Sequence, residues 1–133
     1  MDTRAVIDAY YTAFNDHDGE AMLALMTDDV RHDVNQGERR IGKDAFRAFN
    51  AKMDACYAER LTDIVVMVSE DGTRASAEFT VNGFYTATDD GLPEAQNQRY
   101  TLPAGTFFAL RDGQIARVTT YYNLSDWLRQ IEA

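Results

Sequence analysis

The chain has 133 residues, of which 45% are apolar and 26% charged, a composition typical of a globular domain and not of a disordered, collagen-like or coiled-coil chain. Thirteen basic and 22 acidic residues give a formal net charge of −9. Phosphate backbones and anionic lipids repel such a charge, so we expect neither nucleic acid nor a membrane as partner. The single cysteine cannot form an internal disulfide, and the sequence has no signal peptide or long apolar run. These features predict a cytoplasmic protein that forms one domain over residues 1–133.

The first third of the chain has helical periodicity. Apolar residues recur at spacings of three and four, which predicts a first helix with Asp2 or Thr3 as its cap; they are Val6, Ile7, Tyr10, Tyr11 and Phe14. Asp18 is placed to cap a second, short helix.

A strand and a third helix follow. Residues 30–34 alternate as a strand does, and the Asn-Gln-Gly sequence at 35–37 is a turn signal. The third helix begins near Gly42, and its apolar stripe includes Phe46, Phe49 and Met53.

Beyond residue 60 the sequence changes character. Four segments rich in β-branched and aromatic residues are separated by turn sequences, and they cover 61–68, 75–85, 100–110 and 115–122. The loop at 89–93 is long enough to form the rim of a site. A short terminal helix is predicted to begin at Ser125.

The order of these elements indicates the fold class. Three early helices cannot alternate with the later run of strands as parallel βαβ units. The sequence therefore predicts an α+β fold, in which a strongly curved, mostly antiparallel sheet wraps around three N-terminal helices. Such a sheet forms a cone whose wide end can hold a ligand.

Four stretches carry a resemblance to a known family. They are YYTAFNDHD at 10–18, LMTDDV at 25–30, GKDAF at 42–46 and RDGQI at 111–115. With the order of elements, they resemble the nuclear transport factor 2-like superfamily and, within it, the ketosteroid-isomerase-related and SnoaL-like proteins. The resemblance implies the cone-shaped fold and a homodimer formed through the sheet. It implies no single activity, because this fold hosts isomerases, cyclases, hydrolases, dehydratases and proteins without catalysis.

Ketosteroid isomerases use an aspartate base and an oxyanion hole made of a tyrosine and a protonated aspartate. The resemblance places the tyrosine at Tyr10. It places the base at Val34 and the protonated aspartate at or beside Gly105. Two of the three groups are therefore absent, and the steroid isomerase reaction itself is not expected.

Three residues are candidates for catalysis. His32 shares a strand face with Val30 and Val34, which we expect to point into the cone, and its imidazole titrates near neutral pH. Asp33 faces the opposite way unless a bulge turns it inward. Tyr10 carries the hydrogen-bond donor that the resemblance implies. Each also fits a structural role: a core histidine, a solvated carboxylate and a core phenol.

Apolar side chains on the inward faces form the expected ligand-binding lining, namely Phe14, Val34, Phe49, Met53, Phe79, Val81, Tyr85, Phe107 and Tyr122. Tyr11 is expected to be structural. An ordinary filled core would give the same pattern. The two histidines and single cysteine have no zinc-site spacing, and the sequence contains no glycine-rich phosphate loop, so neither metal nor cofactor is expected.

The sequence thus favours a cofactor-independent isomerase or lyase that moves a proton on a hydrophobic carbonyl compound. In that case His32 or Asp33 is the base, and Tyr10 donates a hydrogen bond to the enolate oxygen. Two alternatives stay open. The protein is a binding module for a small apolar or aromatic ligand, or a dimerising scaffold whose cone is filled.

Overall fold

The computed structural model describes residues 1–132. Helices and strands follow one another in the order α1 (Thr3–Asn15), α2 (Gly19–Leu23), β1 (Met26–Val34), β2 (Arg40–Ile41), α3 (Lys43–Cys56), β3 (Tyr57–Val68), β4 (Arg74–Tyr85), β5 (Gln98–Arg111), β6 (Gln114–Tyr122) and α4 (Leu124–Glu132). Within these residues, no helix combines the length and the apolar character needed to cross a membrane.

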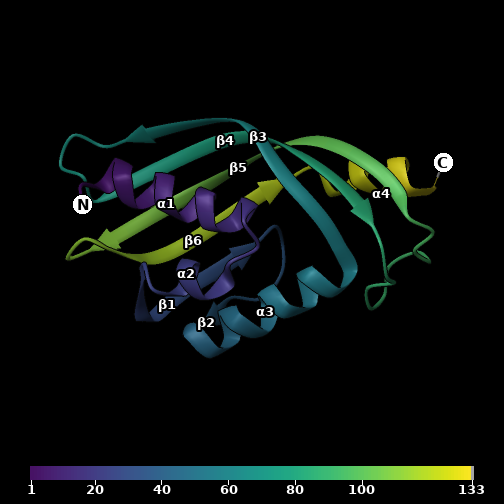
Figure 1. Ribbon diagram of the computed structural model, residues 1–133, viewed down its shortest axis with the longest axis horizontal. Helices are drawn as coiled ribbons and strands as arrows, with labels where there is room; N and C mark the ends of the chain where they lie inside the picture. Colours follow the sequence, from purple (N-terminus) through teal and green to yellow (C-terminus); the bar gives the residue numbers. More distant parts are fainter. Residues whose placement is uncertain (133) are drawn as a thin grey trace.

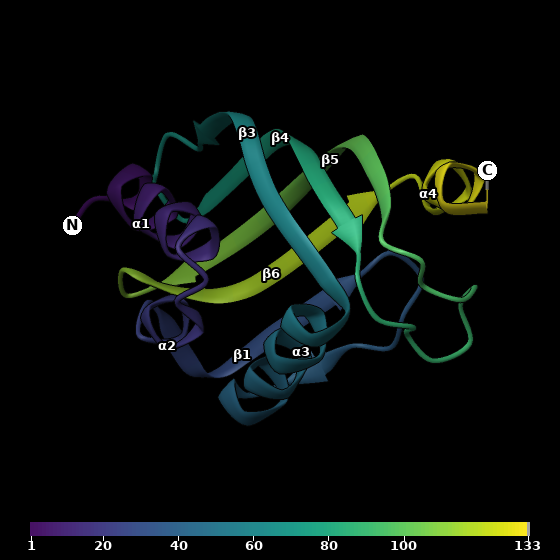
Figure 2. The same cartoon turned by 45° about the vertical axis from the view of Figure 1, so that its right-hand side comes forward.

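All six strands form one sheet in the order β2-β1-β6-β5-β4-β3. The β1–β6 pair is parallel and the other four pairs are antiparallel. Figures 1 and 2 show the sheet curving around the space next to α1, α2 and α3. The predicted α+β class with a curved, mostly antiparallel sheet is confirmed.

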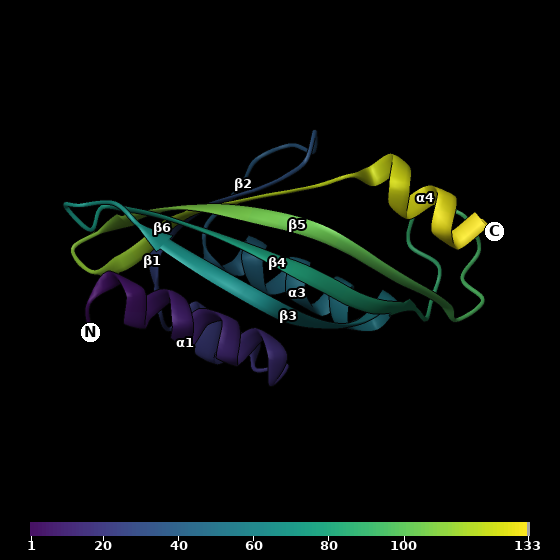
Figure 3. The ribbon, with the colours of Figure 1, turned by 90° about the horizontal axis from the view of Figure 1, so that it is seen from above.

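Helix α1 follows the local rules that its sequence suggested. The Asp2 carboxylate accepts a hydrogen bond of 2.8 Å from the Ala5 N–H, which caps a free donor in the first turn. The helix buries the stripe that contains Val6, Ile7, Tyr10 and Tyr11. Figure 3 shows α1 running beside β3 on one side of the sheet, and the residues of this stripe belong to the hydrophobic core.

The long strands β3, β4 and β5 are joined in succession and make most of the concave wall. The turn from β5 to β6 needs positive φ at both central residues, and Asp112 and Gly113 have φ of 53° and 78°. These values suit a two-residue hairpin. Helix α4 closes the end of the sheet opposite the N-terminus (Figure 1), and its Trp127 is 4% exposed.

Two strands begin four residues earlier than the sequence indicated. Strand β1 begins at Met26 instead of residue 30, and β3 begins at Tyr57 instead of residue 61. Residues 57–60 pair in full register with β4, where Glu59 lies opposite Gly83. In these four added residues of β3, Tyr57 and Glu59 lie on the same face as Leu61, because side chains alternate along a strand.

Candidate functional site

A cavity of about 230 Å³ lies between the concave face of the sheet, α1 and α3. An apolar cavity of roughly 150 Å³ is enough for benzene. The space is therefore of the size that a one-ring or two-ring compound needs.

The cavity exists because large side chains gather around its ends. Aromatic rings form one cluster with Tyr10, Tyr11, Phe79 and Phe108, and another with Tyr57, Tyr85, Tyr100 and Trp127. The wall between them carries smaller residues, among them Val81, Ala104, Thr106 and Thr120. Small side chains on a concave wall cannot fill the space that the aromatic clusters hold open.

Seven of the nine side chains expected to bind a ligand line this cavity. They are Phe14, Val34, Phe49, Met53, Phe79, Val81 and Tyr122.

The other two expectations were wrong. Phe107 points to the outer face of the sheet and is 51% exposed. Its neighbours Thr106 and Phe108 are the inward residues of β5, so the expected phase of this strand was shifted by one residue. Tyr85 is fully buried behind Tyr57, and the two rings stack with centroids 5.4 Å apart. Tyr85 supports the wall and does not line the cavity.

His32 lies on the cavity wall in an aromatic box. Its ring stacks on Phe46 at 4.2 Å and meets Phe49 edge-on at 4.6 Å. Its Nδ1 is buried without a hydrogen-bond partner among the described residues. Burial, reinforced by the positive charge of Arg40, lowers the pKa of His32 to about 4. The imidazole is therefore neutral near pH 7 and has a lone pair to accept a proton.

Asp33 lies on the opposite face of β1. Its carboxylate accepts hydrogen bonds from Arg39 at 2.7 and 3.0 Å and from Thr119 at 2.7 Å. The Arg39 hydrogen bond is the main reason that the pKa of Asp33 is about 2. Although the register of β1 shifts between Met26 and Arg31, Asp33 does not line the cavity, whereas its neighbours His32 and Val34 do. Asp33 thus faces away from the cavity, as alternation predicts for a regular strand, and the alternative in which a bulge turns it inward to act as a base is wrong.

Tyr10 and Tyr11 both line the cavity from α1. Burial raises the pKa of Tyr10 well above its ordinary value, and Tyr11 adds to the effect. Tyr11 was expected to be only structural, but its buried hydroxyl lies beside Thr106 without forming a well-directed hydrogen bond. Burial likewise raises the pKa of Tyr11. Both phenols therefore stay protonated near neutral pH, and both residues line the cavity.

The sequence reasoning missed a carboxyl group in the cavity. Glu59 lines the cavity from β3, and the Tyr100 hydroxyl donates a hydrogen bond to its carboxyl group. Burial raises the pKa of Glu59 above its usual range, while the Tyr100 hydrogen bond acts in the opposite direction. Alternation from Leu61 back through Glu59 to Tyr57 was the signal that could have revealed this residue.

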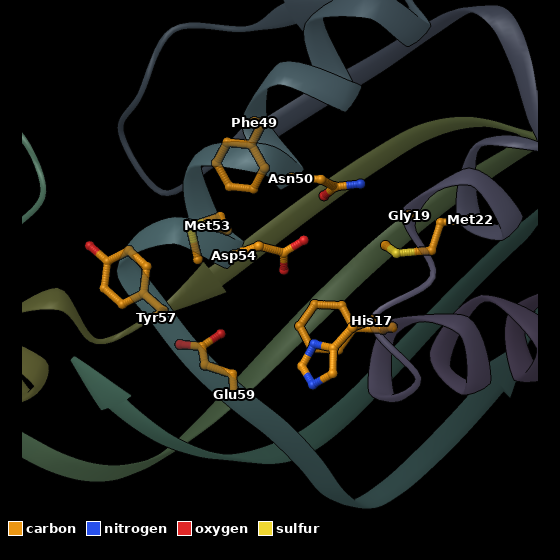
Figure 4. A pocket seen from close by; sticks show the side chains of 10 residues that line it. His17, Gly19, Met22, Phe49, Asn50, Met53, Asp54, Tyr57 and Glu59 are labelled. Carbon is orange, nitrogen blue, oxygen red and sulfur yellow. The ribbon is translucent and has the colours of Figure 1, made fainter. Parts of the chain in front are cut away.

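A smaller hollow of about 70 Å³ forms the mouth of the cavity (Figure 4). His17, in the α1–α2 connection, and Gly19, at the start of α2, face Asn50 and Asp54 of α3 across it. Seven residues line both the mouth and the cavity, so the two are continuous; they are Phe14, Met22, Phe49, Asn50, Met53, Tyr57 and Glu59.

The loop after β4 fixes the rim. The Tyr57 hydroxyl donates to the Asp89 carboxylate at 2.8 Å, and Lys52 of α3 lies 2.9 Å from the same group. Although burial raises the pKa of Asp89, its contacts with Lys52 and Tyr57 lower it overall. The rim therefore carries an ionised carboxylate that is already paired.

The described residues contain no cluster of three or more histidine, cysteine or acidic side chains arranged to hold a metal ion. The cavity is lined by no lysine or arginine within residues 1–132. The polar side chains that line it are the His32 imidazole, the phenols, two threonine hydroxyls, the Asn50 amide, the paired Asp89 carboxylate and the Glu59 carboxyl.

Fold and site together define a cone-shaped α+β protein with a mostly apolar cavity. The sequence profile of the SnoaL-like domain matches residues 7–118, and the chain belongs to this family. The resemblance seen in the sequence is thereby confirmed.

Solved structures of three bacterial proteins are similar over nearly the whole chain. A Pseudomonas putida KT2440 protein is 58% identical, with 98% of each chain covered and a TM-score of 0.97. One from Silicibacter sp. TM1040 is 57% identical, with 98% of this chain and 96% of that chain covered and a TM-score of 0.96. One from Xanthomonas campestris pv. campestris is 52% identical, with 97% and 96% covered and a TM-score of 0.94. Each of these three is described as a proposed polyketide cyclase. No protein of curated function matches the chain.

Proposed function

We propose that this protein catalyses proton transfer on a small hydrophobic carbonyl compound, with His32 as the base. The observation that carries this proposal is the neutral imidazole on the wall of an apolar cavity, with a buried nitrogen that has no hydrogen-bond partner among residues 1–132. The name given to the three similar bacterial proteins, polyketide cyclase, is consistent with a carbonyl-rich substrate.

In the proposed step, His32 takes a proton from the carbon next to the carbonyl group. The C–H electron pair becomes the enolate, and Tyr10 donates a hydrogen bond to the oxygen on which negative charge develops. The imidazolium then returns the proton to a different atom of the same compound, which leaves the protein unchanged. Exclusion of water strengthens the Tyr10 hydrogen bond, because the local dielectric is low.

Proton exchange tests this function directly. The protein is incubated in D₂O with neutral one-ring and two-ring ketones, and deuterium incorporation next to the carbonyl is followed by NMR. His32→Phe keeps the stacking on Phe46 but removes both nitrogens, and we expect exchange to fall about 100-fold or more. Exchange that survives this substitution would remove His32 from the role of base.

A non-catalytic binding module is the second candidate. The positions at which the resemblance places the two catalytic aspartates hold Val34 and Gly105, and a histidine with a pKa of about 4 is a weak base. A ketone that binds with measurable affinity and is recovered without deuterium would favour this alternative.

We also propose that two copies of the chain associate through the outer face of the sheet. Phe107 and Tyr121 are both about half exposed there, and their rings meet edge-to-face at 6.1 Å. Large exposed aromatic pairs are typical of protein–protein contacts.

A further inference from the structure

Three residues lie in one row across the concave face of the sheet. Glu59 on β3 is the register partner of Gly83 on β4, and Gly83 is the partner of Tyr100 on β5. Neighbouring strands are about 4.8 Å apart, so the backbones of Glu59 and Tyr100 are separated by roughly 10 Å. The long phenol side chain crosses β4 and reaches the Glu59 carboxyl.

Gly83 is what permits this crossing. A Cβ atom at position 83 would lie 2.4–2.6 Å from three atoms of the Tyr100 phenol ring, including its oxygen. Any other residue there would displace the ring. The contact between Tyr100 and Glu59 therefore depends on a glycine at the middle position of the row.

This pair faces the same cavity as His32 but from another wall. Both Glu59 and His32 line the cavity. Phe49 touches the His32 ring and lines the mouth, which Glu59 also lines from β3 (Figure 4). A ligand of one or two rings that packs against Phe49 can therefore present one end to each group.

We propose that Glu59 and Tyr100 form a second polar subsite, which donates a hydrogen bond to a neutral oxygen of the ligand, such as a ketone or quinone carbonyl, and rejects carboxylates. The subsite rests on the proposed function in one respect, because the same ligand must contact both His32 and the Glu59–Tyr100 pair. It names the substrate class as neutral compounds with an oxygen at the end remote from His32.

The chemistry of the subsite supports this class. Tyr100 donates to one carboxyl oxygen of Glu59, and burial favours the protonated acid, whose O–H is then free to donate to a ligand. A carboxylate at the Glu59 end would lose its hydration and meet no lysine or arginine among the lining residues of the described chain. Arg40, which lies over the Phe49 ring, acts on the His32 end of the cavity. Burial of an unpaired charge is strongly unfavourable.

Other titratable groups face this part of the cavity, and they set the controls for any pH experiment. They are Tyr57 on β3, Tyr122 on β6, Asp54 on α3, His17 in the α1–α2 connection and Asp89 in the rim loop, which Lys52 pairs. Lys52 balances the charge of Asp89. Asp54 and Glu59 then leave this part of the cavity negative or neutral, which adds to the preference against anionic ligands.

A matched pair of probes tests the subsite. Binding of 2-acetylnaphthalene, a neutral ketone, and of 2-naphthoate, a carboxylate of similar shape, is measured by calorimetry near pH 7. We expect the ketone to bind at least about 100-fold more tightly, because burying an unpaired carboxylate is costly. Equal affinities, or failure of the ketone to bind, would overturn the proposal.

Variants of Glu59 separate hydrogen bonding from packing. Glu59→Leu should weaken ketone binding about tenfold by removing the donor, while Glu59→Gln, which keeps an N–H donor, should restore it to within about threefold. Glu78 lies outward on β4, so Glu78→Gln is the matched control and should leave both affinities unchanged. Equal binding by the wild type and Glu59→Leu would contradict the assignment.

Two further variants test the row itself. Gly83→Ala should displace Tyr100 and weaken ketone binding. Gly105→Ala on β5 is the control, because its Cβ would meet only the Ala77 carbonyl oxygen, at an ordinary 3.5 Å. If Gly83→Ala does not fold, Tyr100→Phe removes the hydroxyl alone and should weaken ketone binding about threefold to tenfold. Unchanged ketone binding in Tyr100→Phe would exclude Tyr100 from the subsite.

The pH dependence gives a readout that a structural role would not change. Ketone affinity should fall as pH rises and Glu59 loses its proton, and it should be flat in Glu59→Gln. A His17→Asn background removes the histidine at the mouth as a source of this effect. A flat wild-type profile would contradict a protonated Glu59. If the wild type prefers the ketone over the carboxylate but catalyses no deuterium exchange, the proposed function is overturned and the subsite is supported.

Discussion

Acidification should destabilise this protein through a single buried side chain. His32 is 4% exposed, and its pKa is lowered from its ordinary value of 6.5 to about 4. An unfolded chain therefore binds a proton at His32 throughout a pH range in which the folded chain does not. By linkage, the stabilising contribution of the neutral His32 is fully present above about pH 6.5. It declines as the pH falls and is lost by about pH 4 and below.

The size of the effect follows from the same pKa values. A pKa that moves from 6.5 to about 4 corresponds to about 3 kcal/mol, at about 1.4 kcal/mol for each tenfold change in proton affinity. Domains of this size unfold with free energies of roughly 5–15 kcal/mol. Protonation of His32 therefore removes a large part of the total stability.

Urea denaturation across this pH range, in the wild type and in His32→Phe, measures the contribution. Phenylalanine fits the aromatic box next to Phe46 and has no titrating group. The difference in unfolding free energy between the two proteins should change by about 3 kcal/mol between about pH 7 and pH 4, with similar m values. Glu59 has a raised pKa and acts in the opposite direction, since its stabilising proton is lost as pH rises, but it is present in both proteins and cancels. Parallel pH profiles would refute the reasoning.

Three other predictions concern the cavity, the rejected base and the outer face. Val81→Trp places a large ring in the cavity and should abolish the thermal shift that ketone ligands produce in the wild type; a shift that persists would place the ligand elsewhere. Asp33→Asn should leave deuterium exchange within about threefold of wild type, because Asp33 faces Arg39 and not the cavity; a loss of about 100-fold would restore Asp33 as the base. The double variant Phe107→Ser, Tyr121→Ser should be smaller in solution than the wild type by light scattering, and an unchanged mass would exclude this face as the dimer contact.

The sequence predicted the fold well because periodicity is a local property. The stripe from Val6 to Tyr11 and the alternation around Val81 can be recognised without knowledge of their partners. The order of elements then restricted the topology. Element ends were less certain: β3 continues back to Tyr57, because pairing with β4 stabilises a segment whose own sequence is ambiguous.

The phase of β5 shows where local information ends. Phe107 and Phe108 are adjacent and both aromatic, so alternation does not say which of them points inward. The preceding Pro103, Ala104 and Gly105 provide little contrast between the two faces. Pairing of β5 with both β4 and β6 decides the matter, and it places Phe108 inside.

The Glu59–Tyr100 pair was beyond sequence reasoning for a stronger reason. The two residues are 41 positions apart, and their contact requires the registers of three strands and the absence of a side chain at Gly83. The same holds for the cavity, whose volume is set by where the two aromatic clusters fall relative to the small residues of the wall. Polar groups at opposite walls of one such space can act on one ligand only if the space stays open. The proposed function therefore requires small residues at two places: Gly83, which leaves room for the Tyr100 ring, and the small side chains of the wall, which leave room for a ligand.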